Sequence, residues 1–92
     1  MRRGSLPEAI AVSLAEALSI ADAAASVREA AVALRARFAT LRVVVVDALD
    51  MRGEAPAAVG TRRRLYFGAS DGHCWSVTAD AAQARGLFLC DS

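Results

Sequence analysis

Four consecutive valines at positions 43–46 place the strongest constraint on the fold of this chain. Valine is branched at Cβ, so a run of valines loses side-chain freedom in a helix but packs well on a pleated strand. We therefore predict a strand over residues 42–48. Because the run is apolar on both sides, we expect this strand to be buried on both faces or to lie at the centre of a sheet.

The chain before the valines is rich in alanine and has the periodicity of two helices. Apolar residues recur at spacings of three and four, which predicts a first helix over residues 6–19. Ser5 and Glu8 have the spacing of a capping box, and Pro7 suits the first turn, where its missing N–H is not needed. This helix should present one apolar stripe to the core.

A second helix should follow a break, because one helix reaching residue 39 would be about 50 Å long, too long for a compact domain of this size. Asp22 is the preferred cap of the second helix, and Ser26 with Glu29 offers an alternative capping box. The spacing of its apolar stripe could also form a coiled-coil seam, but two repeats are too few, so we favour packing within the domain. The stripe consists of Val27, Ala31, Leu34, Phe38 and Leu41.

A second strand is predicted over residues 63–68 by the alternation of its side chains. Leu65 and Phe67 share one face, and Arg64 and Tyr66 share the other. A loop of about a dozen residues joins this strand to the valine strand, and loops of that length are often mobile or functional.

Turn residues at 69–72 predict an antiparallel hairpin, with the chain returning over residues 73–78. Trp75 and Val77 should share the inward face of this third strand, because side chains alternate along a strand. The residues on its other face are Cys74, Ser76 and Thr78.

The end of the chain predicts a short helical turn capped by Asp80 and a last strand over residues 87–91. If this strand pairs with the third, Cys74 and Cys90 lie on neighbouring strands. The predicted fold class is α+β, with two N-terminal helices packed on one face of a mostly antiparallel four-stranded sheet. With 92 residues, the chain makes a single domain, residues 1–92.

The charge and cysteine content narrow the class of partner. A net charge of +1 argues against duplex DNA or an anionic membrane, which require a clustered basic surface. The longest aliphatic run is far shorter than a membrane span.

Two cysteines without a secretory signal indicate reduced thiols. We expect a cytoplasmic protein without a membrane partner or a cofactor.

A thiol or metal chemistry is one alternative function. Asp71, His73 and Cys74 stand close together at the predicted turn, with Cys90 as a second thiol. Adjacent strand residues point to opposite faces, so a Cys–His dyad is disfavoured. The three residues are also short of the four-ligand Cys/His pattern of a zinc site. Buried, inert thiols are the preferred interpretation.

Two charged clusters allow further alternatives. Three acids follow the valine strand and could bind magnesium or act as an acid/base pair, although solvated acids at a strand end are commoner. They are Asp47, Asp50 and Glu54. Three consecutive arginines near aromatic residues could bind single-stranded nucleic acid, although charges that protect a sheet edge are the favoured interpretation. They are Arg62, Arg63 and Arg64.

The predicted sheet leaves apolar side chains on the face that the two helices do not cover. Such a surface is typical of a site for a protein partner or a homodimer. The interaction residues that we predict are Tyr66, Cys74, Ser76 and Thr78. This pattern favours a small non-enzymatic interaction protein over an enzyme.

Three short segments carry a resemblance to a known family. LYF at residues 65–67, DGHC at 71–74 and GLFL at 86–89 resemble a family of small uncharacterised proteins found among the nitrogen-fixation genes of proteobacteria. The resemblance implies a cytoplasmic accessory role near nitrogenase assembly or its electron supply. It assigns no site residue.

Overall fold

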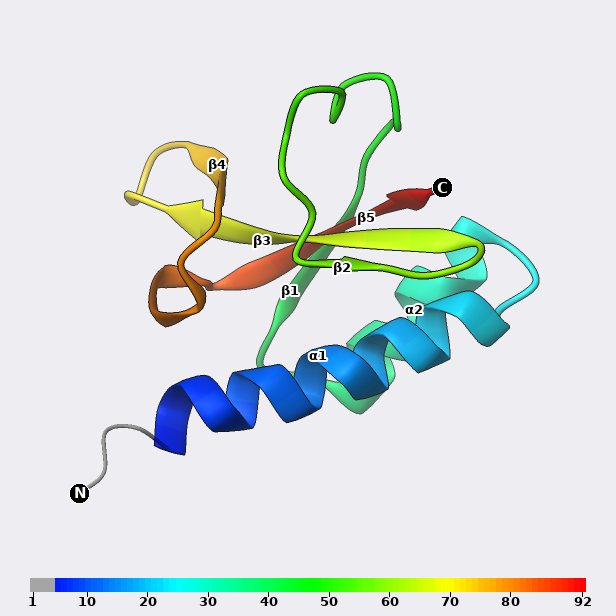
Figure 1. Cartoon of the computed structure of the whole chain (residues 1–92), viewed down its shortest axis with the longest axis horizontal. Coiled ribbons are helices and arrows are strands. Elements are labelled where there is room, and N and C mark those ends of the chain that lie inside the picture. Colours follow the sequence, from blue (N-terminus) through cyan, green and yellow to red (C-terminus); the bar gives the residue numbers. More distant parts are fainter. Residues whose placement is uncertain (1–4) are drawn as a thin grey trace.

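Two helices are followed by a mixed sheet, which confirms the predicted α+β class (Figure 1). The fold is described from a computed structural model, covering the backbone of residues 5–92 and the side chains of residues 14–92. The capping box predicted at Ser5 and Glu8 therefore lies outside the described side chains. In chain order the elements are α1 (Ser5–Ala23), α2 (Val27–Arg37), β1 (Arg42–Val45), β2 (Ala58–Val59), β3 (Arg63–Ser70), β4 (Trp75–Thr78), the 3-10 turn η1 (Ala81–Gln83) and β5 (Gly86–Asp91).

The break between the helices lies later than the preferred prediction. α1 continues to Ala23, and Ser26 has extended backbone angles and accepts the N–H of Glu29 at 3.1 Å, so Ser26 caps α2. The cap predicted at Asp22 is wrong, because Asp22 lies inside α1 and its carboxylate binds a distant turn instead. The alternative capping box is the one that forms.

The sheet has the strand order β1-β5-β3-β2, and β4 pairs with the other end of β3. β1 and β5 are parallel, whereas β5, β2 and β4 each run antiparallel to β3. The sheet is thus mostly antiparallel, as predicted, with one strand more than expected. The extra strand β2 has only two residues, too few for a sequence pattern to reveal.

The position predicted for the valine strand is wrong. β1 is an edge strand of four residues, and Val45 is 41% exposed. The central position belongs to β5, which lies between β1 and β3 and buries Leu87, Leu89 and Cys90. Of the two apolar strands, β5 therefore buries both of its faces, and the valine run buries chiefly Val43.

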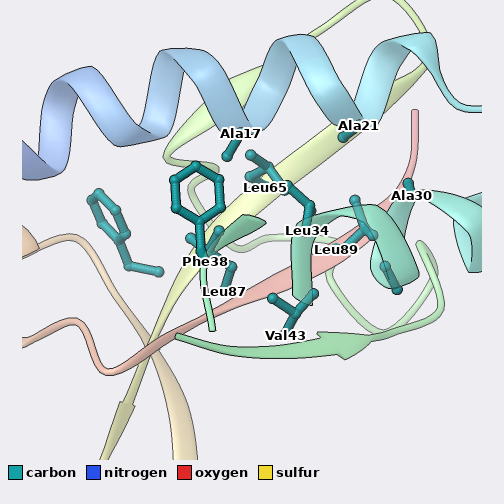
Figure 2. Packing of buried hydrophobic residues seen from close by; sticks show 11 residues of the cluster. Ala17, Ala21, Ala30, Leu34, Phe38, Val43, Leu65, Leu87 and Leu89 are labelled. Carbon is teal, nitrogen blue, oxygen red and sulfur yellow. The ribbon is translucent and has the colours of Figure 1, made fainter. Parts of the chain in front are cut away.

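The main core lies between the two helices and the sheet (Figure 2). Small alanines of the helices allow close approach, and leucines fill the space between the layers. The buried residues labelled in Figure 2 are Ala17, Ala21, Ala30, Leu34, Phe38, Val43, Leu65, Leu87 and Leu89. All five residues of the predicted stripe pack in this core, but α2 ends at Arg37, so Phe38 and Leu41 do so from beyond the helix. The shared face predicted for Leu65 and Phe67 on β3 is confirmed.

A second, smaller core lies on the helix-free face of the sheet. Met51 belongs to the loop after β1, and it is buried there with Tyr66 and Cys90. Figure 1 shows this loop, in green, arching on the side of the sheet opposite the helices. The helix-free face is thus covered by the loop at one end and uncovered at the other, where β4 begins.

Candidate functional site

Strand pairing decides the face on which each predicted residue lies. Val77 pairs with Gly68, and Trp75 pairs with Ser70. Directly paired residues point to the same side, so Trp75 and Val77 share the helix-free face with Tyr66. Trp75 is 38% exposed, which corrects the prediction that it faces inward.

The four predicted interaction residues do not form one surface. Tyr66 is only 1% exposed, because the loop that carries Met51 covers it. Thr78 pairs with Phe67, a residue of the main core, so Thr78 and Ser76 lie on the helix side. Cys74 is exposed at the turn before β4. For β4 the sequence identified the strand parity correctly but assigned the two faces in reverse, whereas the faces of β3 were predicted correctly.

Trp75 is instead the centre of the uncovered part of the helix-free face. Its ring lies edge-on to Phe88, with 6.5 Å between the ring centroids and an interplanar angle of 72°. The guanidinium of Arg42 lies 6.0 Å from the centroid of the Trp75 ring. A Cβ atom at Gly68 would lie 3.3 Å from the Trp75 ring, so the absence of a side chain at Gly68 lets the indole pack closely on β3. We call Arg42, Val44, Trp75 and Phe88 the Trp75 surface.

An open groove of about 570 Å³ adjoins the Trp75 surface. Its lining includes two arginines, Arg42 and Arg85, and two hydroxyl residues, Thr40 and Ser70, and none of the described residues that line it is acidic. Sequence reasoning missed this groove, because its residues come from four separate segments of the chain. The lining consists of Ala39, Thr40, Leu41, Arg42, Ser70, Trp75 and Arg85.

The consecutive arginines point in three different directions. Arg62 is exposed, and Arg63 is only 3% exposed, with its guanidinium donating to the carbonyl of Ala24 at 3.0 Å. Nε of Arg63 also lies 3.4 Å from Oδ1 of Asp91. Arg64 is half-buried and pairs with Cys90. The run therefore tethers α1 and β5 to β3 and presents one arginine to solvent. The prediction that these charges protect a sheet edge is wrong, because β3 lies between β5 and β2.

Asp22 completes this tether from the helix side. Its carboxylate accepts the backbone N–H groups of Thr61, Arg62 and Arg63 at 2.8, 3.0 and 2.9 Å. The pKa of Asp22 lies below its ordinary value, because the N–H of Arg62 and its two neighbours stabilise the carboxylate more than partial burial penalises it. A side chain at Gly60 would collide with this carboxylate. The interaction is structural, and an acid 39 residues before its first partner gave no sequence signal for it.

The turn that holds the predicted thiol or metal residues is organised by one carboxylate. Oδ1 of Asp71 accepts the N–H groups of His73 and Cys74, each at 2.9 Å. The bond from Cys74 and then that from His73 hold the pKa of Asp71 below its ordinary value. Asp71 therefore acts as a turn former, with His73 and Cys74 exposed beside it.

The two cysteines are not on paired strands. β5 pairs with β1 and β3. The predicted third strand, residues 73–78, corresponds to β4, so the pairing that would have placed the two cysteines on neighbouring strands does not form. Cys90 is fully buried, and burial raises the pKa of its thiol. Cys74 is in solvent and Cys90 is in the second core, so the prediction of buried thiols is confirmed for Cys90 and wrong for Cys74.

The predicted acidic cluster is spread along the loop after β1. Asp47 accepts the N–H of Leu49 at 2.8 Å, and Asp50 and Glu54 are exposed. Among the described residues, no group of three or more His, Cys, Asp or Glu side chains is placed to hold a metal ion. The loop acids therefore form turns and a solvated surface.

No family model, curated protein or solved structure matches this chain. Within the part of the chain that the structure describes, no helix combines the length and apolar character needed to cross a membrane.

Proposed function

We propose that this protein is a small non-enzymatic interaction protein that binds a partner protein through the Trp75 surface. The observation that carries the proposal is the exposure of Trp75. This residue is 38% exposed at the uncovered end of the sheet, and Phe88 and Arg42 contact its ring. Tryptophan and arginine are the residues most enriched among those that dominate binding energy at protein interfaces.

The held orientation of Trp75 supports a binding role. The ring packs above Gly68 and against Phe88, so little side-chain freedom is left to lose when a partner covers it. Side chains that are ordered before association bind at a lower entropic cost. The opposite end of the same face is closed by Met51, which limits the docking area to the Trp75 surface and the groove beside it.

The perturbed carboxylates support a non-enzymatic role. Shifted pKa values often mark catalytic groups, but the pKa shifts of Asp22 and Asp71 come from backbone N–H groups within turns. These two acids hold the fold together and lie outside the lining of the groove. The resemblance to proteins of nitrogen-fixation gene clusters suggests a cytoplasmic accessory role there, with the partner a protein of nitrogenase assembly or electron supply.

Capture of partners with matched variants tests this function. The tagged protein should retain a defined protein from cells grown under nitrogen-fixing conditions, and Trp75→Ala should lose it. Leu49→Ala is the control, because Leu49 is 70% exposed on the covering loop and lies outside the Trp75 surface. Equal capture by the wild-type and Trp75→Ala proteins would contradict the proposal.

Light scattering separates a foreign partner from self-association. We expect the purified protein to be monomeric at micromolar concentration and to form a complex only with the captured protein. A stable dimer that Trp75→Ala dissociates would show that the surface serves a second copy of this chain instead.

A further inference from the structure

The groove beside Trp75 carries positive charge that no acidic side chain of the described residues neutralises. Arg42 and Arg85 are exposed and line it together. Among the described residues, the ion pairs are Arg37 with Glu16 and Arg63 with Asp91, so neither groove arginine has an acidic partner. Two unpaired guanidiniums facing one hollow form a ready site for carboxylate or phosphate groups.

The positive lining continues along the outer edge of the sheet. A second hollow of about 340 Å³ is lined by Arg35, Leu41, Arg42, Val43 and Val44, and it shares Leu41 and Arg42 with the groove. The two hollows therefore adjoin, and Arg85, Arg42 and Arg35 follow one another along them without an acidic side chain in either lining. Arginines that follow one another along two adjoining open hollows form a positive track, which suits an extended chain better than a compact ligand.

The edge of β1 provides backbone groups beside this track. Val46 donates its N–H to Leu89 on β5, so Val43 and Val45, which alternate with it, direct their backbone groups away from the sheet. The carbonyl of Val43 is held by the guanidinium of Arg35 at 2.7 Å. Because Arg35 occupies the Val43 carbonyl, an extended segment lying here reaches the outward backbone groups of Val45, while its acidic side chains meet the arginines.

The geometry points to an acidic, extended segment of a partner protein as the occupant, with its carboxylates on Arg42 and Arg85 and an apolar side chain against Trp75. This inference depends on the proposed function and specifies the chemistry of the partner. A nucleic acid fits less well, because Arg63 and Arg64 are turned into the fold and the net charge is only +1, which leaves few phosphate contacts.

The single tryptophan of the chain lies in this groove and reports binding directly. The probe is a synthetic peptide of alternating Glu and Val residues, titrated against the intrinsic fluorescence at low salt. We expect a saturable change that weakens at high salt, since exposed ion pairs are screened. A peptide in which Gln replaces Glu should bind at least about fivefold more weakly, as expected when several exposed ion pairs are lost.

Arginine variants locate the site. Arg42→Gln and Arg85→Gln should each weaken binding about two- to fivefold, the scale of one exposed ion pair, and the double variant should weaken it further. Arg42→Lys and Arg85→Lys keep the charge and should recover part of the loss. Arg52→Gln is the control, because Arg52 is exposed on the covering loop and outside both hollows.

Three outcomes would overturn the inference. They are equal binding of the Gln peptide, an equal loss in Arg52→Gln, and tighter binding of oligothymidine than of the acidic peptide. If the acidic peptide fails while Trp75→Ala still abolishes capture of a partner, the proposed function stands and only the acidic character of the partner is refuted.

Discussion

Asp22 connects parts of the chain that lie far apart in sequence. One carboxylate near the end of α1 receives three N–H groups from the turn between β2 and β3. Arg63 strengthens the same junction, because its buried guanidinium donates to the carbonyl of Ala24 just beyond that helix. A charged hydrogen-bond acceptor is roughly twice as effective as a neutral one, so the ionised form of Asp22 matters.

Asp22→Asn should destabilise the fold and reduce its sensitivity to acid. The pKa of Asp22 is lower in the folded protein than the value of 3.8 for an unperturbed Asp, so its contribution is fully present above that pH and is lost as the pH falls toward the folded pKa. Urea unfolding at pH 7 and at pH 3 measures both effects. Asp50→Asn is the control, because Asp50 is exposed on the loop. Some acid sensitivity should remain from Asp71, whose pKa is also lowered.

The two thiols should react in two separate stages. Cys74 is exposed and should react with a thiol reagent in the native protein, whereas Cys90 is fully buried and should react only after unfolding. Counting the thiols with and without denaturant measures this difference. The Cys74→Ser protein should show no native reaction. Rapid native modification of Cys90 would mean that the second core opens readily.

At the level of elements, the outer edge of the sheet is blocked by a side chain. Among the described residues, no strand pairs with the outer side of β1, and free strand edges invite association between molecules. The guanidinium of Arg35 reaches from α2 and binds the carbonyl of Val43 through Nε at 3.1 Å and Nη2 at 2.7 Å. This arrangement protects the edge of the strand that carries the valine run.

Removing the edge block should promote self-association. Arg35→Ala leaves the Val43 carbonyl without its donor, which should lower the free energy of unfolding by about 1 kcal/mol, the net value of a typical hydrogen bond. It should also raise the apparent mass in light scattering at high concentration. Arg28→Ala is the matched control on the exposed side of α2. A monomer indistinguishable from the wild type would show that the edge needs no protection.

Two glycines set how closely the strands and the tryptophan approach one another. A Cβ at Gly86 would collide with the backbone carbonyl of Arg42, so Gly86→Ala must push β1 away from β5 and should cost about 3 kcal/mol. At Gly68 the contacts are with the rings of Trp75 and Phe88, which can shift, so Gly68→Ala should cost about 1–2 kcal/mol. Chemical denaturation should show a larger loss of unfolding free energy for Gly86→Ala than for Gly68→Ala. Only Gly68→Ala should strongly change the tryptophan emission.

At the level of the whole molecule, the last strand occupies the middle of the sheet. β5 pairs in parallel with β1, joining Arg42 to Gly86, and antiparallel with β3. Both cores contain residues of β5, because Leu87 and Leu89 lie on the helix side and Cys90 on the other. Neither core can close until the end of the chain is in place.

A chain truncated after residue 85 should therefore fail to fold. It lacks the strand that connects β1 to the rest of the sheet, so we expect loss of the cooperative unfolding transition and of dispersed amide signals in NMR spectra. Removal of Ser92 alone is the control. Ser92 donates its backbone N–H to the carbonyl of Arg62 at 2.9 Å and its hydroxyl to the carbonyl of Gly60 at 3.3 Å, and the loss of these two exposed bonds should leave the fold intact.

The features that the sequence determined by itself are those encoded over a few neighbouring residues. The apolar stripe of α2, the alternation along β3, the hairpin to β4 and the cap at Asp80 all follow from local periodicity, turn residues or side-chain hydrogen bonds. Local geometry is repeated in every chain that carries such a pattern, so these predictions are confirmed.

Only the tertiary structure decided the strand order, the edge position of the valines, the cover provided by Met51 and the face on which Trp75 lies. These depend on competition between segments dozens of residues apart for the same buried area. The valine run and β5 are both apolar, and the sheet has one central position between them, which β5 takes. The groove of Arg42, Arg85 and Trp75 exists because of that outcome, since it forms where the ends of β1, β3 and β5 meet.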